Sequence, residues 1–307
     1  MRKRLQNRVA ESRFAFPVTM LYALAVWMAA GAISRELYLQ FFLFAVSTLM
    51  MVTLNNSNAL IRIYSRMVSC SFVIMTCAAT FMFSSTESAV VQTCFISFYL
   101  LLFRIYQDKR APGIAFYSFL CLGVASLYFV QILYFMPFLW ILMRANLMAL
   151  SHKMFIASIL GIIAPYWFAT GYFFYIGQPE WILEHFALLG EFSPLFCIDV
   201  IDTHRICIFA IVFLMAIVGI VHYLRNSYLD KIRTRMLFEV FVTINLLAFV
   251  FIVLQPQHFD VLLPVIIVNT SCLYAHFISL TKTRFTNATF VIISLMVFAL
   301  TVFNLLY

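Results

Sequence analysis

The sequence predicts an all-α, multi-pass membrane protein with about ten or eleven membrane segments and a cytoplasmic N-terminus. Hydrophobic residues make up 64% of the 307 residues and charged residues only 10%, and the mean hydropathy is +1.00. A soluble domain carries about 25% charged residues, so this chain has too little charge to cover a water-soluble globule of its size. Apolar stretches of about 18 to 23 residues recur along it, which is the length that a helix needs to cross a bilayer.

The charges between these stretches predict the orientation. When successive stretches cross in alternating directions, 18 of the 20 Lys and Arg residues fall on one side. Short loops rich in Lys and Arg stay in the cytoplasm, so we expect this side to be the inner one. The two basic residues left on the outer side are Arg35 and Arg205.

The first part of the chain alternates apolar spans with short polar loops. Its basic start resembles that of a signal peptide, but the apolar run that follows is longer than the usual core of about 7–15 residues, so we expect an uncleaved span. Residues 34–36 and 84–88 form outer turns, and residues 55–66 and 104–110 form inner loops. The spans expected here are Phe14–Ile33, Leu37–Leu54, Met67–Phe83 and Ala89–Phe103.

The apolar run Ile114–Met143 decides the topology of the rest. As one helix it would measure about 45 Å, against a hydrocarbon core of about 30 Å. One crossing would leave 11 basic residues inside and 9 outside, whereas a break near residues 126–128 gives 18 and 2. The charge distribution therefore favours a hairpin of two short helices.

Five further spans complete the predicted bundle. Pro165 lies near the middle of the first and predicts a kink. The acidic outer segment Gly177–Arg205 mixes aromatic and acidic residues and predicts a helix in the outer interface. No stretch has the composition of a linker, so we expect residues 1–307 to form a single integral membrane domain. The remaining spans are Met154–Ile176, Ile206–Leu224, Met236–Leu254, Val261–Leu280 and Ala288–Tyr307.

The sequence argues against a soluble-type nucleotide enzyme and predicts no cofactor. It has no phosphate-binding Gly-rich loop, no HExxH and no GxSxG motif, and only eight glycines. The net charge of +8 lies in the short inner loops, where it sets orientation and contacts anionic lipid, so we expect no nucleic-acid partner. Four outer residues have ligand chemistry for a divalent metal but match no known spacing, so we predict no metal site. They are His185, Asp199, Asp202 and His204.

Few ionisable residues lie inside the predicted spans, where such residues indicate function by default. Glu239 lies one turn into its span, and we expect it to pair with Arg235. His222 and His276 lie near inner ends, where they can reach water, and the sequence does not predict a proton relay there. Four amide side chains are expected to form hydrogen bonds between helices. They are Gln92, Gln131, Asn245 and Asn269.

Three stretches resemble the middle of the GT-C-type membrane glycosyltransferases, which use polyprenyl-phosphate-linked sugars. Phe98–Arg104 leads into a basic loop, Gly123–Pro137 has a Gly-x-Ala turn and an apolar run ending in proline, and Lys153–Trp167 carries a proline within a span. The whole chain also resembles an uncharacterised family of polytopic inner-membrane proteins from Bacteroidetes. These resemblances imply a multi-pass protein of the bacterial cytoplasmic (inner) membrane with a GT-C-like scaffold.

The resemblance also implies candidate site residues on the outer side. In GT-C enzymes the catalytic acid lies in a long first outer loop, which here is only Ser34-Arg35-Glu36. Glu36 is therefore the one residue that could carry the catalytic role, and whether the protein is an enzyme stays open. An outer arginine can bind a lipid phosphate through bidentate bonds, which makes Arg35 and Arg205 candidates. His258 and Asp260 are expected to complete the rim of that site.

Three functions are compatible with these observations. The first is a lipid-handling or envelope-glycan-related protein, whose partners are membrane lipids, polyprenyl-phosphate-linked glycan among them. The second is a non-catalytic subunit or assembly factor of a membrane complex, which would have membrane-protein partners. The third is a transporter or flippase. The lipids that the purified protein retains would separate the first function from the other two.

Overall fold

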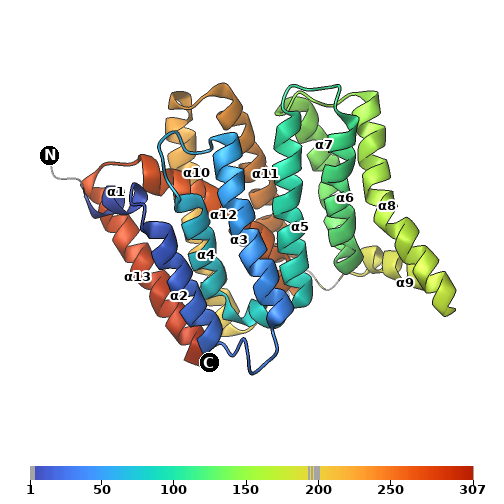
Figure 1. Cartoon of the computed structure of the whole chain (residues 1–307), viewed down its shortest axis with the longest axis horizontal. Coiled ribbons are helices and arrows are strands. Elements are labelled where there is room, and N and C mark those ends of the chain that lie inside the picture. Colours follow the sequence, from blue (N-terminus) through green and yellow to red (C-terminus); the bar gives the residue numbers. More distant parts are fainter. Residues whose placement is uncertain (1–3, 193, 195, 197–200, 307) are drawn as a thin grey trace.

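Helices account for 82% of the computed structural model, and the described residues contain no strand. The structure describes residues 4–192, 194, 196 and 201–306. Within them, seven helices are long and apolar enough to cross a membrane. These are α3 (Tyr38–Asn58), α5 (Thr86–Leu102), α8 (His152–Ile176), α10 (Thr203–Asn226), α11 (Ile232–Leu254), α12 (Phe259–Leu280) and α13 (Arg284–Leu306). The predicted all-α multi-pass fold is confirmed (Figure 1).

Shorter helices complete the bundle and turn the chain between its two ends. The α-helices among them are α1 (Leu5–Ala10), α2 (Ala15–Ala29), α4 (Met67–Ala78), α6 (Pro112–Tyr128), α7 (Met136–Ala145) and α9 (Trp181–Ala187). The 3-10 segments are η1 (Thr80–Ser84), η2 (Phe103–Ile105), η3 (Val130–Phe135), η4 (Leu188–Gly190), η6 (Ser227–Leu229) and η7 (Pro256–His258).

The apolar run that begins at Ile114 folds as a hairpin. Helix α6 ends where Phe129 leaves the helical region, with φ −144° and ψ 89°. Segment η3 then packs on α6, and η3 and α7 carry the chain back to the end where α6 begins. The two ends of the hairpin meet, because the backbone N–H of Gln107 donates to the carbonyl of Leu147 at 2.8 Å. The predicted hairpin is therefore confirmed, and its turn lies at residue 129, one residue beyond the predicted break.

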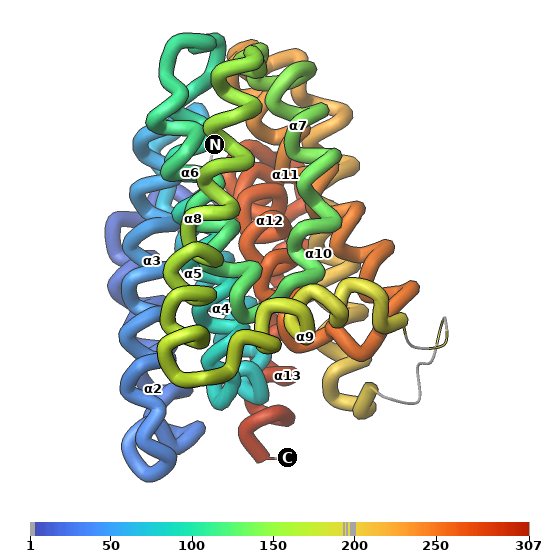
Figure 2. The backbone as a smooth tube through the Cα atoms, turned by 90° about the vertical axis from the view of Figure 1, so that its right-hand side faces the viewer, coloured from blue at the N-terminus to red at the C-terminus, as the bar shows by residue number. Residues whose placement is uncertain are grey.

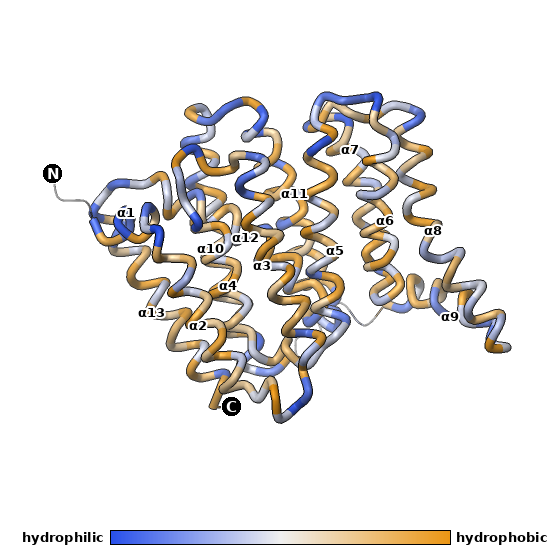
Figure 3. Tube along the Cα trace, in the orientation of Figure 1, coloured by the Kyte–Doolittle hydropathy of each residue, from blue (hydrophilic) through white to orange (hydrophobic). Residues whose placement is uncertain are grey.

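The basic loops lie together at one end of the bundle. The end drawn uppermost in Figure 1 holds the connections α3–α4, α5–α6, α7–α8, α10–α11 and α12–α13. Figure 3 shows that these connections are largely hydrophilic. Helix α1 is fixed to this end, since Gln6 Nε2 donates to the carbonyl of Ile278 at 2.9 Å and Asn7 Nδ2 to that of Thr281 at 2.9 Å. We call this end the basic face and the other end the opposite face.

Helix α12 forms the core of the bundle. Of its most apolar window, 94% is buried, and it packs against α4, α5, α10 and α11 (Figure 2). A helix that is apolar on all sides is stable only when neighbours surround it. Gly219 lets α10 approach α12 closely, because a Cβ there would lie 2.7 Å from the carbonyl carbon of Leu273.

The hydrogen bonds predicted between helices are found at three of the amide side chains. Asn245 Nδ2 donates to Thr270 Oγ1 at 3.1 Å, and the Tyr99 hydroxyl donates to Asn269 Oδ1 at 2.8 Å. Gln131 Nε2 bonds the carbonyl of Leu188 at 3.2 Å. Three of the four predicted amides therefore join separate elements, as polar residues commonly do in membrane bundles.

Helices α6 and α8 form the closest pair at one edge of the bundle. A Cβ on Gly161 would lie 2.4 Å from the carbonyl oxygen of Phe116, and one on Gly123 would lie 2.8 Å from that of Ile162. Small residues let membrane helices approach backbone to backbone in this way. Beyond Pro165 the rest of α8 leans away from the bundle (Figure 1), in agreement with the predicted kink.

Candidate functional site

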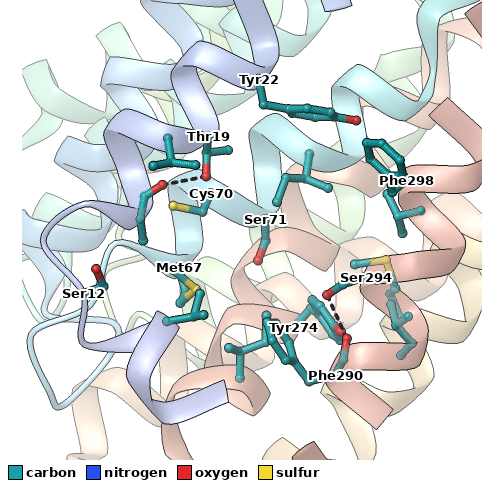
Figure 4. A pocket seen from close by; sticks show the side chains of 18 of the residues that line it. Ser12, Thr19, Tyr22, Met67, Cys70, Ser71, Tyr274, Phe290, Ser294 and Phe298 are labelled. Carbon is teal, nitrogen blue, oxygen red and sulfur yellow. Dashed lines mark hydrogen bonds between the residues drawn. The ribbon is translucent and has the colours of Figure 1, made fainter. Parts of the chain in front are cut away.

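A cavity of about 500 Å³ lies at the other edge of the bundle, on the side of the basic face. Helices α2 and α13 form its two walls, and α4, α10 and α12 form its floor, with Cys70, Met215 and Tyr274 among the floor residues (Figure 4). Nearly all of its lining is apolar. We call it the lateral pocket.

The lateral pocket opens sideways, where a bilayer would surround the protein. The lining residues Phe14, just before α2, and Val18 within it are 75% and 61% exposed, and Phe298 of α13 is 56% exposed. On the floor, by contrast, Met215 and Tyr274 are buried. Exposed apolar residues at the mouth and buried ones behind them indicate an entrance from lipid rather than from water.

Contacts at its two ends keep the pocket in shape. Toward the opposite face, the Tyr22 hydroxyl of α2 donates to Thr301 Oγ1 of α13 at 2.8 Å, and the Tyr22 and Phe298 rings lie 6.4 Å apart. Toward the basic face, Val9 of α1 and Ser12 of the α1–α2 turn line the end of the pocket. The two walls are thus joined at the end toward the opposite face and lie apart along the rest of the pocket.

The polar groups of the lateral pocket are few. Thr19 Oγ1 donates to the carbonyl of Ala15 and Ser294 Oγ to that of Phe290, both at 2.7 Å within their own helices (Figure 4). The hydroxyl of Tyr274 is buried and has no hydrogen-bond partner among the described residues. A buried hydroxyl without a partner costs about 1–3 kcal/mol, so a ligand that accepted a hydrogen bond from it would gain affinity.

Basic residues surround the end of the pocket at the basic face. Arg8 and Arg13 are exposed and flank the lining residues Val9 and Ser12 in the sequence. Arg66 precedes the first residue of α4, and its guanidinium carbon lies 5.6 Å from the ring centroid of Tyr64. An anionic head group beside the pocket would meet favourable charge here.

The predicted outer site is divided in the structure. Arg205 meets Asp260, with Nη2 2.9 Å from Oδ2, and its Nη1 lies 3.2 Å from Asp202 Oδ2. The ring of His258 packs against Phe129 and Phe251, with centroid distances of 5.1 and 5.7 Å. The structure therefore brings Arg205 and Asp260 together, but the guanidinium already serves two carboxylates.

Arg35 and Glu36 lie elsewhere, in the exposed connection between α2 and α3. Their side chains make no hydrogen bond or ion pair with any described residue, so nothing joins them to Arg205. Glu36 has a φ of 54°, in the left-handed region that non-glycine residues rarely adopt. A phosphate site at Arg35 or Arg205 with Glu36 beside it stays a prediction.

Two expectations about the basic face are wrong. Glu239 accepts a hydrogen bond from Asn146 Nδ2 at the end of the hairpin, and no ion pair with Arg235 occurs within the described part of the chain. His276 does not reach water but is fully buried, with Nε2 2.9 Å from Asp230 Oδ2. Asp230 lies 46 residues away in a loop, so helix positions alone could not reveal this pair.

The predicted interfacial helix is present as α9, which runs across the opposite face (Figure 2). It packs on the tip of the hairpin: His185 Nε2 donates to the carbonyl of Ser126 at 3.0 Å and lies 3.3 Å from the Tyr166 hydroxyl. Trp181 stacks on the His185 ring, with centroids 4.8 Å apart. Burial lowers the pKa of His185, and the hydrogen bond to Ser126 opposes that shift.

The metal ligands considered from the sequence do not gather. His185 lies in the α9 contact, and Asp202 is paired with Arg205. Asp199 falls outside the described residues. Among the residues that the structure describes, no group of three or more His, Cys, Asp or Glu side chains could hold a metal ion.

No protein-family model, curated protein or solved structure matches the chain.

Proposed function

We propose that this protein is a lipid-handling protein of a bacterial cytoplasmic membrane, and that it binds a lipid in the lateral pocket. The observation that carries the proposal is an apolar cavity of about 500 Å³ whose mouth lies between exposed apolar residues of α2 and α13. Ligand pockets in proteins commonly measure about 300–1,000 Å³ and are mostly apolar with a few polar groups. A lipid tail would enter this pocket directly from the bilayer.

The charges favour an anionic lipid of the cytoplasmic leaflet. Arg8, Arg13 and Arg66 lie around the basic end of the pocket, and each Lys or Arg near a membrane surface attracts anionic lipid by about 1 kcal/mol. The Tyr274 hydroxyl could donate to an ester carbonyl below the phosphate. A polyprenyl phosphate linked to a glycan shares this chemistry of an apolar tail with a phosphate.

The position of the pocket favours lipid binding over transport along the axis of the bundle. Helix α12 fills the middle of the bundle, whereas a transporter needs a path along its axis. The pocket instead lies at the edge, between two helices that touch near one end. The function proposed is therefore binding and presentation of a lipid, with the GT-C-like arrangement of the hairpin as a scaffold.

A matched pair of variants tests the proposal. Ile293→Trp places a large ring at a buried lining position, while Leu295→Trp places it two residues along α13 at an exposed one. Mass spectrometry of lipid retained by the purified protein should show loss of bound lipid with the first and normal retention with the second. Equal retention in both would overturn the lateral pocket as the binding site.

The same measurement identifies the class of lipid. Arg8→Gln combined with Arg13→Gln should leave the amount of bound lipid nearly unchanged in neutral-lipid nanodiscs. In nanodiscs with anionic phospholipid the preference for the anionic species should fall, because the charges that attract phosphate are gone. Retention of a polyprenyl phosphate by protein from cells, in excess over bulk phospholipid, would identify that carrier as the ligand.

A further inference from the structure

Three titratable side chains from separate elements meet inside the basic face, away from the lateral pocket. His276 of α12 has Nε2 2.9 Å from Asp230 Oδ2, and Nδ1 3.2 Å from Nδ1 of His222 in α10. The side chains of His276 and Asp230 are 0% and 3% exposed, and His222 is half-buried. None of the three lines the pocket.

The hydrogen bonds determine where the protons lie when both imidazoles are neutral. A carboxylate only accepts, so His276 must carry its proton on Nε2 to bond Asp230. Nδ1 of His276 is then an acceptor, and Nδ1 of His222 must donate to it. The atom left to accept a further proton is Nε2 of His222, at the half-buried end of the chain.

We infer that His222, His276 and Asp230 form one proton-binding site, loaded through Nε2 of His222 and emptied by the same route. When a proton bonds to that atom, the N–H bond at His222 Nδ1 can break while one forms at His276 Nδ1. The result is a neutral His222 and an imidazolium at His276, directly beside the Asp230 carboxylate. The site gains one proton in total, and the internal transfer breaks one N–H bond at His222 and forms one at His276.

The site takes a single proton. Two imidazolium rings whose Nδ1 atoms lie 3.2 Å apart would repel each other, and like charges at such distances disfavour a second protonation. The buried carboxylate, in contrast, stabilises the first positive charge through a direct hydrogen bond. The geometry therefore makes the two histidines one site for a proton rather than two independent sites.

Several charged and polar side chains surround the site, and Arg62 opposes its protonation. Arg62 Nη1 lies 3.8 Å from Asp230 Oδ1, and the same atom donates to the carbonyl of Leu229 at 3.2 Å. Its positive charge opposes protonation but is partly exposed and therefore screened. The Tyr223 ring packs on His276, and its hydroxyl donates to the carbonyl of Arg235 at 2.9 Å. The other charged groups near Tyr223 are Arg235 and Glu239.

Protonation changes how firmly this face is held together. Without the extra proton, the buried Asp230 has a neutral histidine beside it and Arg62 at 3.8 Å. With the proton bound, His276 gives Asp230 a directly hydrogen-bonded positive charge. Asp230 belongs to the α10–α11 connection, Arg62 to the α3–α4 connection, and both are tied to α12 through His276. We therefore expect both connections to pack more firmly on α12 in the protonated form.

Nitrogen NMR of the whole protein, labelled with ¹⁵N-histidine in nanodiscs, tests the assignment. The unaltered protein at high pH should show the proton of His276 on Nε2 and that of His222 on Nδ1, with both rings changing over one shared titration. Neutral His222 carrying its proton on Nε2 would overturn the proposal without recourse to any variant. Spectra of His222→Gln and His276→Gln assign the two rings.

Variants then test the linkage to the carboxylate. Asp230→Asn should lower the midpoint of the shared titration by about one pH unit or more, because an adjacent opposite charge shifts such equilibria by that amount. His276→Gln should uncouple His222, which would titrate alone. His152→Gln changes an exposed histidine on the same face and should leave the shared titration where it is. An unchanged midpoint in Asp230→Asn would show that the carboxylate takes no part.

Discussion

The two edges of the bundle differ in how closely their helix pairs pack. At one edge, Gly123 and Gly161 bring α6 and α8 so close that a Cβ on Gly161 would lie 2.4 Å from a backbone oxygen. At the other, α2 and α13 are joined by the Tyr22–Thr301 hydrogen bond near one end and enclose a cavity of about 500 Å³ along the rest.

Under the proposed function, the difference separates a structural helix contact at one edge from a ligand-binding one at the other. In a bilayer the hydrophobic effect does not drive helices together, so close association depends on small residues and on hydrogen bonds. The α6–α8 pair has the small residues and closes. The α2–α13 pair has large apolar side chains instead, and Phe14, Val18 and Phe298 are exposed around the mouth of the pocket.

The largest effect expected concerns the side of the membrane on which the pocket lies. In a cysteine-free background, single cysteines at Lys109, Met148 and Tyr228 on the basic face should resist an impermeant thiol reagent in intact cells, since positive loops remain inside. A cysteine at Ala187 in α9 should react fully.

Permeabilised cells serve as the control, because all four exposed positions should then react. Reaction of Met148→Cys but not Ala187→Cys in intact cells would invert the orientation. Under the proposed function, the lateral pocket would then take its lipid from the outer leaflet.

The closed edge should be intolerant of added volume. Gly161→Leu forces side-chain atoms against the backbone of α6, and we expect a loss of about 3 kcal/mol in the free energy of unfolding. Thermal unfolding in detergent would show a clearly lower melting temperature.

Gly171→Leu is the matched control on the same helix, since nothing lies within 4 Å of the position of its Cβ. It should change stability by no more than about 0.5 kcal/mol. Equal destabilisation by both variants would mean that the close approach of α6 and α8 does not hold this edge.

The sequence predicts the turn of the hairpin at the closed edge, but it does not predict the lateral pocket. The charge count alone placed a turn within Ile114–Met143, because a wrong crossing would have put nine basic residues outside. Gly123 was noted as part of a turn motif, yet it lies within α6 as a packing contact with α8. Spacing along one helix does not show which neighbour it meets.

The candidate site was harder to predict for the same physical reason. The lateral pocket combines residues from α1, α2, α4, α10, α12 and α13, none of them unusual in its own helix. The Asp230–His276 pair joins residues 46 positions apart, and no pattern along α12 indicates which loop carboxylate His276 meets. Arg205 and Asp260 were both named from the sequence, but their mutual ion pair depends on how α10 and α12 align.

A smaller effect is expected when the end contact of the open edge is weakened. Tyr22→Phe removes one hydrogen bond between α2 and α13, worth about 1 kcal/mol. With every cysteine except Cys70 and Cys272 replaced, Cys70 on the pocket floor should react faster with a membrane-permeant maleimide than in the protein with Tyr22. Cys272, buried in the core outside the pocket, should stay equally protected in both proteins. A Cys70 rate that does not change would mean that Tyr22 does not limit the opening.

The smallest effect concerns α9, which rests on the tip of the hairpin beside the closed edge. Because burial between Trp181 and Tyr166 lowers the pKa of His185, the docked helix holds a neutral ring, whereas an undocked ring would titrate near 6.5. Docking is therefore fully stable above that pH and weakens as the pH falls below it, since only the undocked form gains a proton readily. Hydrogen exchange at residues 181–187, corrected for its intrinsic pH dependence, should be faster at pH 5.5 than at pH 7.5. His185→Gln should abolish that difference and Glu184→Gln, on the exposed side of the same helix, should keep it; a difference that survives His185→Gln would assign the pH response to another group.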